Sequence, residues 1–177
     1  WILPLVAACG LGGQTLSFEE YEPRSTLVTE QRHVPRAKYP FVDVHLHQTR
    51  CVTAPCLDGL LKEMDALNMA IMVNSPVRGG AGARFREFSK AQKGHAPKRF
   101  AAFTNLEETG LDDPGYAERA ARLLEDDIRA GAQGLKVWKH FGMGLKDAAG
   151  NRIPLDDPRF DRAFEICGQH GVPVLIH

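Results

Sequence analysis

Short apolar runs alternate with amphipathic segments from residue 41 to the end of the chain. The apolar runs, each long enough for one buried strand, lie at 41–47, 70–74, 100–104, 135–139 and 172–177. Apolar residues at helical spacing fill the segments between them, near 57–67, 83–92, 116–130 and 157–170. Strands that alternate with helices in this way predict a parallel sheet that is buried on both sides.

The spacing of the predicted strands indicates the kind of sheet. Five strand starts between residues 41 and 172 give about 33 residues per βα unit, close to a (β/α)₈ barrel of roughly 250 residues in eight units. We therefore expect an α/β fold: a partial (β/α)₈ TIM barrel over residues 41–177, with about the first four βα units plus strand 5. A doubly wound sheet is the alternative fold.

The chain before residue 41 has a different character. Residues 1–8 are apolar, and the small residues of VAA precede Cys9. A bilayer span needs about 20 residues, so this stretch is too short to be one. It resembles the remnant of a bacterial lipoprotein signal over residues 1–9, which implies cleavage before Cys9 and a lipid on its thiol. A chance apolar N-terminus with a buried cysteine is the other interpretation.

Residues 10–40 are polar and are interrupted by Pro23, Pro35 and Pro40, which predicts an extended arm. The lipoprotein resemblance implies a protein of the bacterial cell envelope, periplasmic or on the outer surface, that meets a membrane only through its lipid anchor.

Composition excludes several classes of protein. The chain is 44% hydrophobic and 25% charged, a globular balance. Lys plus Arg and Asp plus Glu both number 22, so no net charge attracts nucleic acid, and we expect no nucleic-acid partner. Cys51 and Cys56 are near enough to close a small loop, but Cys167 would stay unpaired, and we expect free thiols.

Histidines close the first and the fifth predicted strands. A strand alternates its faces, so His45 and His47 project from the same side, and His177 follows the strand that ends the chain. In a barrel, all three lie at the rim that carries the active site, whereas a doubly wound sheet gives no reason for such a cluster. Neutral imidazoles suit zinc and related divalent ions. We therefore predict a divalent metal, zinc first, on His45, His47 and His177.

Three ordered stretches carry a family resemblance: VDVHLH at 42–47, GLKVWK at 134–139 and PVLIH at 173–177. Over about residues 36–177 the chain resembles the amidohydrolase-related metal-dependent hydrolases (amidohydrolase family 2). The resemblance implies a TIM barrel whose metal is held by His45, His47 and His177. It also implies a histidine after strand 6 and an aspartate after strand 8. These would lie beyond His177, so the catalytic residues stay unassigned and we expect no turnover from these 177 residues alone.

Four more residues are candidates for the site. Some amidohydrolases carboxylate a lysine on the fourth strand to bridge two metals, which would fall on Lys136 or Lys139; the other interpretation is a lysine paired with a carboxylate or with a negative group of the substrate. Lys139 and His140 lie where the strand passes into a loop and suit substrate contact better. Arg50 would meet an anionic small-molecule substrate or be a solvated loop arginine. Asp43 would orient a histidine or be structural.

The activity expected from this pattern is hydrolysis, with metal-activated water attacking a C–N or C–O bond at a carbonyl. Decarboxylation of an unsaturated or aromatic acid is an alternative, because related barrels perform it with the same histidines. A non-catalytic lipoprotein that uses the barrel as a binding module is the third interpretation.

The small residues before Cys9 lead to a labelling experiment. In a host that processes lipoproteins, the complete precursor should incorporate labelled fatty acid, and a Cys9→Ser variant should lose the label because it lacks the acceptor thiol. Equal labelling of the two proteins would remove the lipoprotein assignment.

Overall fold

The computed structural model describes residues 17–30 and 32–177. The chain divides into two units, Trp1–His33 and Val34–His177. In the first unit, the described residues are exposed and form neither helix nor strand. The lipoprotein-like segment 1–9, with Cys9, lies outside the described residues. Among the helices of the described chain, none has the length and apolar character needed to cross a membrane.

The unit Val34–His177 is built on short strands that all pair in parallel. They form two three-stranded sheets: β1 (Phe41–Leu46), β2 (Met69–Asn74) and β3 (Phe100–Ala102), then β4 (Thr104–Asn105), β5 (Leu135–Val137) and β6 (Val174–Ile176). Phe103 joins β3 to β4. Its N–H donates to the carbonyl of Asn74 at 2.9 Å, and the next N–H, that of Thr104, donates to Gly134 at 3.0 Å. One segment therefore passes its pairing from β2 to β5, and the row has five strand positions.

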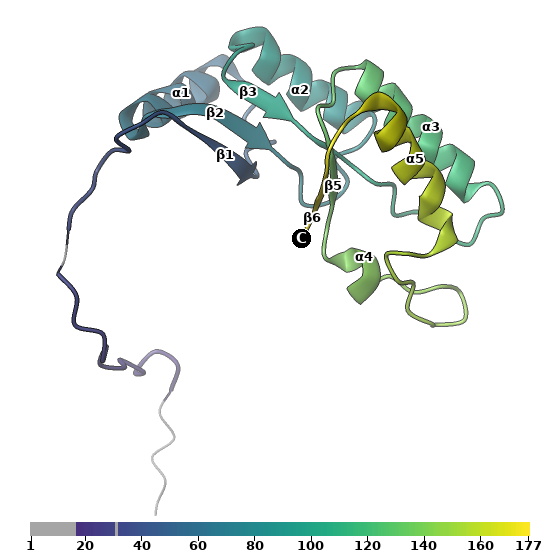
Figure 1. Ribbon diagram of the computed structural model, residues 1–177, viewed down its shortest axis with the longest axis horizontal. Helices are drawn as coiled ribbons and strands as arrows, with labels where there is room; N and C mark the ends of the chain where they lie inside the picture. Colours follow the sequence, from purple (N-terminus) through teal and green to yellow (C-terminus); the bar gives the residue numbers. More distant parts are fainter. Residues whose placement is uncertain (1–16, 31) are drawn as a thin grey trace, which may run out of the picture. The chain divides into compact units, whose positions relative to one another are not determined.

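Helices connect these strand positions. They are α1 (Ala54–Leu67), α2 (Ala83–His95), α3 (Tyr116–Arg129) and α5 (Asp161–His170), the last preceded by the single 3₁₀ turn η1 (Pro158–Phe160). Figure 1 shows the four longer helices along one side of the strands. The predicted α/β fold, a partial (β/α)₈ TIM barrel with four units plus a fifth strand, is confirmed.

The fourth predicted strand is shorter than expected. β5 ends at Val137 rather than at residue 139, because the chain turns there into the short helix α4 (His140–Met143). The N–H of Phe141 donates to the carbonyl of Trp138 at 2.9 Å, which closes this turn. Lys139 and His140 therefore lie at the start of α4, just beyond the carboxyl end of the strand.

The core lies between the helices and the strands. Leu124 of α3, Leu135 of β5 and Phe160 of η1 are fully buried in one cluster, while Leu57 and Met64 of α1 are buried against β2 in another. Close packing also explains one glycine: a Cβ at Gly134 would lie 2.5 Å from the ring of Phe103, so only glycine lets this ring lie over the start of β5.

The expectation of free thiols was wrong for one pair of cysteines. Cys51 and Cys56 form a disulfide, with Cα atoms 5.6 Å apart. The pair forms because the β1–α1 connection folds back onto the first turn of α1. Cys167 is free and buried in α5, and burial raises the pKa of its thiol to about 11.

These thiol states can be checked by alkylation of the folded chain without reductant. At about pH 8, Cys167 should resist iodoacetamide because its thiol is buried and protonated. Cys51 and Cys56, which lie on one tryptic peptide, should remain unalkylated because their disulfide leaves no free thiol. Mass spectrometry after digestion measures both states, and the same treatment in denaturant is the control in which Cys167 becomes alkylated. Rapid labelling of Cys167 in the folded chain would contradict its burial.

Candidate active site

Three histidines from the two ends of the strand row meet in space. The ring centroids of His45 and His47 are 5.0 Å apart, and those of His45 and His177 are 5.2 Å apart. The ring planes of each pair are nearly perpendicular. His45 lies in β1, His47 follows its end, and His177 follows β6. The carboxyl end of the parallel row therefore carries a cluster of imidazoles.

This meeting requires a curled row of strands. β1 and β6 lie at the first and fifth positions of the row. In a flat sheet, strands about 4.8 Å apart would place these two positions about 19 Å from each other. The side chains from the two ends meet at a centroid separation of 5.2 Å. Barrel-like curvature is thus what creates the cluster.

A backbone carbonyl holds the ring of His47. Its Nδ1 lies 2.5 Å from the carbonyl oxygen of Ser75. A carbonyl only accepts hydrogen bonds, so this contact assigns the proton to Nδ1 and leaves a lone pair on Nε2. Metal-binding histidines commonly donate their second ring N–H in this way. The tautomer of His47 therefore suits a metal ligand.

Lys136 places a buried amine beside the histidines. Its side chain is fully buried, and its Nζ lies 3.2 Å from Nε2 of His45. Desolvation lowers the pKa of Lys136. Desolvation, and then the charge of Lys136, also lower the pKa of both His45 and His177. Both shifts favour the neutral imidazole, which is the form that binds metals.

The donor set fits a divalent metal in kind and spacing. With Zn–N bonds of about 2.0–2.1 Å, imidazoles around a tetrahedral ion have ring centroids roughly 5.2 Å apart, close to the separations seen here. The ammonium of Lys136, in contrast, lies at Nε2 of His45, where a ligated cation would be, and its positive charge would oppose that cation. Across the described residues, however, no three His, Cys, Asp or Glu side chains are arranged to hold an ion as they stand. Metal binding would therefore include side-chain rotation.

Buried amides fix the loop that follows His47. The N–H of Gln48 donates to Oδ1 of Asn74 at 2.7 Å, and Nδ2 of Asn74 donates to Gln92 at 2.9 Å. Nε2 of Gln92 donates to the carbonyls of Gln48 and Cys51, at 2.8 and 3.2 Å. Asn74 and Gln92 are fully buried. They link β2 and α2 to the loop and so position the end of β1.

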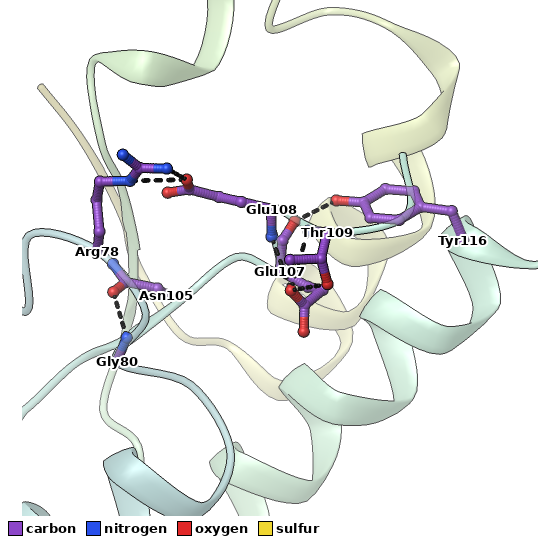
Figure 2. A network of polar contacts seen from close by, with 7 residues as sticks. All are labelled: Arg78, Gly80, Asn105, Glu107, Glu108, Thr109 and Tyr116. Atoms are coloured by element: carbon purple, nitrogen blue, oxygen red, sulfur yellow. Dashed lines mark hydrogen bonds and ion pairs between the residues drawn. The ribbon is translucent and has the colours of Figure 1, made fainter. Parts of the chain in front are cut away.

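Asn105 makes a similar link one strand further along. Its Oδ1 accepts the N–H of Gly80 at 2.9 Å (Figure 2), and its Nδ2 donates to the carbonyls of Pro76 and Lys136 at 3.0 and 3.1 Å. The buried amide thus joins the β2–α2 connection to β5. No motif in the sequence singled out Asn74, Gln92 or Asn105. The signal for the two asparagines is a polar residue that closes an apolar strand.

Two glutamates after β4 are held by their neighbours in the network of Figure 2. The carboxylate of Glu108 pairs with Arg78 at 2.7 Å. The carboxylate of Glu107 accepts the hydroxyl of Thr109 at 2.8 Å, and its carbonyl accepts the hydroxyl of Tyr116 at 2.6 Å. These residues, Tyr116 excepted, line a hollow of about 510 Å³ at the carboxyl ends of the strands. Both acidic groups are engaged within the fold.

The other predicted residues surround the cluster at different places. Lys139 is exposed, and its Nζ lies 5.1 Å from the ring centroid of Trp138, which packs in a T-shaped arrangement with the ring of His177. His140 begins α4, and its carbonyl accepts the N–H of Gly144 at 2.8 Å. Arg50 lines a second hollow with His47. Of the four further candidates, Lys136 is the one placed directly against the histidines.

Asp43 has a local role. Its Oδ1 accepts the backbone N–H of His45 at 2.9 Å. This bond lies within β1 and fixes the backbone at the first histidine. The structural role proposed for Asp43 from the sequence agrees with this contact.

Comparisons with known proteins bear on the fold. No family model and no curated protein matches the chain. A solved structure of 2,6-dihydroxybenzoate decarboxylase complexed with 2,6-dihydroxybenzoate is similar, with 22% identity and a TM-score of 0.52; the match covers 68% of this chain and 38% of that one. A 2,6-dihydroxybenzoate decarboxylase from Rhizobium is similar as well, with 19% identity and a TM-score of 0.53, over 80% of this chain and 50% of that one. The chain spans half or less of each, and the likeness supports the partial-barrel fold.

The amide network gives a stability prediction. A Gln92→Met variant keeps the length of the side chain but removes its bonds to Gln48, Cys51 and Asn74, leaving buried polar groups unpaired. We expect the free energy of unfolding to fall by about 1–3 kcal/mol, measured by urea denaturation. Gln133→Met is the matched control, because Gln133 is exposed, and it should change stability by less than about 0.5 kcal/mol. Equal stabilities of the two variants would show that the network does not stabilise the fold.

Proposed function

We propose that this chain forms the histidine site of a metal-dependent enzyme of the amidohydrolase-related type, which acts on a small molecule. His45, His47 and His177 would hold a divalent ion, zinc first. The convergence of these three imidazoles at the carboxyl ends of β1 and β6 carries the proposal. Such an ion lowers the pKa of a bound water toward 7 and polarises a carbonyl, which suits hydrolysis of a C–N or C–O bond.

The chain's own residues prepare this site. The carbonyl of Ser75 keeps the proton of His47 on Nδ1, and the depressed pKa values of His45 and His177 keep their lone pairs available. Asp43 fixes the backbone of His45. These contacts and shifts favour the tautomer of His47 and the neutral forms of His45 and His177 that a metal would require.

Lys136 retains two of the roles considered from the sequence. Among the ion pairs of the described chain, none joins Lys136 to a carboxylate, so its charge is not neutralised within this part of the fold. Its amine would meet a negative group of the substrate, or become carboxylated and serve as a metal ligand. Desolvation favours the neutral amine that carboxylation needs, and the contact with His45 at 3.2 Å supports a role for Lys136 at the histidines.

Decarboxylation of an aromatic or unsaturated acid is the second candidate reaction. The two solved structures described above are 2,6-dihydroxybenzoate decarboxylases, and one is complexed with 2,6-dihydroxybenzoate. The buried cation of Lys136 beside the histidines would suit a substrate carboxylate. A lipid-anchored binding module of the cell envelope, without catalysis, is the alternative that an activity assay must exclude.

Zinc binding tests the proposed site. The chain should bind zinc near one equivalent, and His45→Ala, His47→Ala or His177→Ala should each weaken binding at least about tenfold, because each removes one of three ligands. Equilibrium dialysis with metal analysis measures the affinity. His95→Ala is the control, since His95 lies on α2 and contacts Asp58 at 2.8 Å, away from the cluster. Unchanged binding in all three variants would refute the site.

The type of reaction is determined by activity assays of the intact natural polypeptide that contains these residues, loaded with metal. Release of carbon dioxide from 2,6-dihydroxybenzoate and related acids would assign decarboxylation. Cleavage of amides or esters would assign hydrolysis. If neither the acids nor the amides and esters react, the result would favour the binding module.

A further inference from the structure

A second hollow, of about 340 Å³, opens beside the histidine cluster. Its lining comes from the β1–α1 connection, the β2–α2 connection and the first turn of α2. The residues are His47, Thr49 and Arg50, then Pro76, Val77 and Arg78, and finally Arg84. We call it the arginine hollow. His47 belongs to both the cluster and the hollow, so a small molecule at the histidines would extend into this space.

The positive charge of the arginine hollow is only partly compensated. Arg78 is neutralised by Glu108 at 2.7 Å. Within residues 17–30 and 32–177, neither Arg50 nor Arg84 forms an ion pair, and both side chains are exposed to solvent. No carboxylate lines the hollow. Two guanidinium groups with unused donors therefore face the same small space as His47.

The wall between these charges is apolar. Pro76 is buried and Val77 half-buried, and both line the hollow beside the arginines. A volume near 340 Å³ lies at the small end of the range for ligand sites, about 300–1,000 Å³. The hollow thus offers room for part of a small carbon skeleton, with cationic groups available at its edge.

We propose that Arg50 and Arg84 bind a second anionic oxygen group of the substrate, a carboxylate or a phosphate, while the reacting group lies at the histidines. The proposal rests on the proposed function and narrows its substrate class to small molecules with a reacting carbonyl or carboxyl group and a separate anion. Guanidinium groups suit this role because their planar N–H donors match the oxygens of either anion. Pro76 and Val77 would contact the apolar part between the two groups.

Anion binding is first measured on the metal-free full chain, so that the result does not depend on the histidines holding a metal. The probes are benzoate and inorganic phosphate, followed by NMR titration. The double variant Arg50→Met/Arg84→Met should bind the preferred anion about tenfold more weakly, since both charged donors are lost. Arg122→Met is the control: Arg122 is exposed on α3, does not line the hollow, and should leave affinity within about twofold.

The preferred probe identifies the anion: benzoate indicates a carboxylate and phosphate a phosphoryl group. Substitution of these exposed, unpaired arginines should leave the urea midpoint unchanged, which keeps misfolding from imitating a loss of binding. Wild-type affinity in the double variant, or no binding of either probe to the wild-type chain, would overturn the proposal.

A second measurement uses the zinc-loaded chain with isophthalate, which carries two carboxylates, against benzoate, which carries one. Isophthalate should bind at least about tenfold more tightly, and the double variant should abolish the difference. Zinc binding without arginine-dependent anion binding would refute the arginine hollow and leave the metal site standing. Arginine-dependent anion binding without zinc binding would refute the metal site and leave the arginine hollow standing.

Discussion

Parallel pairing along one curled row of strands is the constraint on which the site depends. The row begins at β1 and ends at β6, and its curvature brings side chains from these two ends within 5.2 Å. At Phe103, in the middle of this row, strand pairing passes from β2 to β5. Gly134 provides the space for the Phe103 ring. A change in packing at this point would alter the curvature and so separate His45 from His177.

Buried amide side chains fix the loops that surround the histidine cluster. Asn74, Gln92 and Asn105 each connect a strand end to a neighbouring loop through side-chain hydrogen bonds. Such bonds are directional, and a buried amide that loses a partner costs free energy, so the loops have few alternative positions. The disulfide between Cys51 and Cys56 ties the same β1–α1 connection to the start of α1. The strand row sets the distance between the histidines, and the amides hold the loops around them.

Hydrophobic periodicity was sufficient to predict the order of strands and helices and the pairing of His45 with His47 on one face, because these follow from local geometry. The contacts of Gln92 were not predictable, since its partners Gln48 and Cys51 lie 44 and 41 residues away and share no pattern with it. The disulfide was misjudged because the sequence does not show how the β1–α1 connection folds back. Only one of the two arginines of the arginine hollow could be identified from the sequence. Arg50 follows the histidine pair along the chain, whereas Arg84 reaches the hollow through the βα connection of the next strand.

Charge links the two parts of the site. Lys136, Arg50 and Arg84 are cations without carboxylate partners in the described chain. Of the acidic groups nearby, Glu108 is paired with Arg78, and the one carboxylate of Asp43, which accepts the backbone N–H of His45, leaves these three cations in excess. The described mouth is therefore electropositive, which opposes the arrival of a metal cation and favours an anion. An anionic group in the arginine hollow would reduce this repulsion, and a bound cation would in turn attract the anion. By linkage, each would strengthen the binding of the other by the same factor, so the charges surrounding the histidines would make metal binding and substrate binding cooperative.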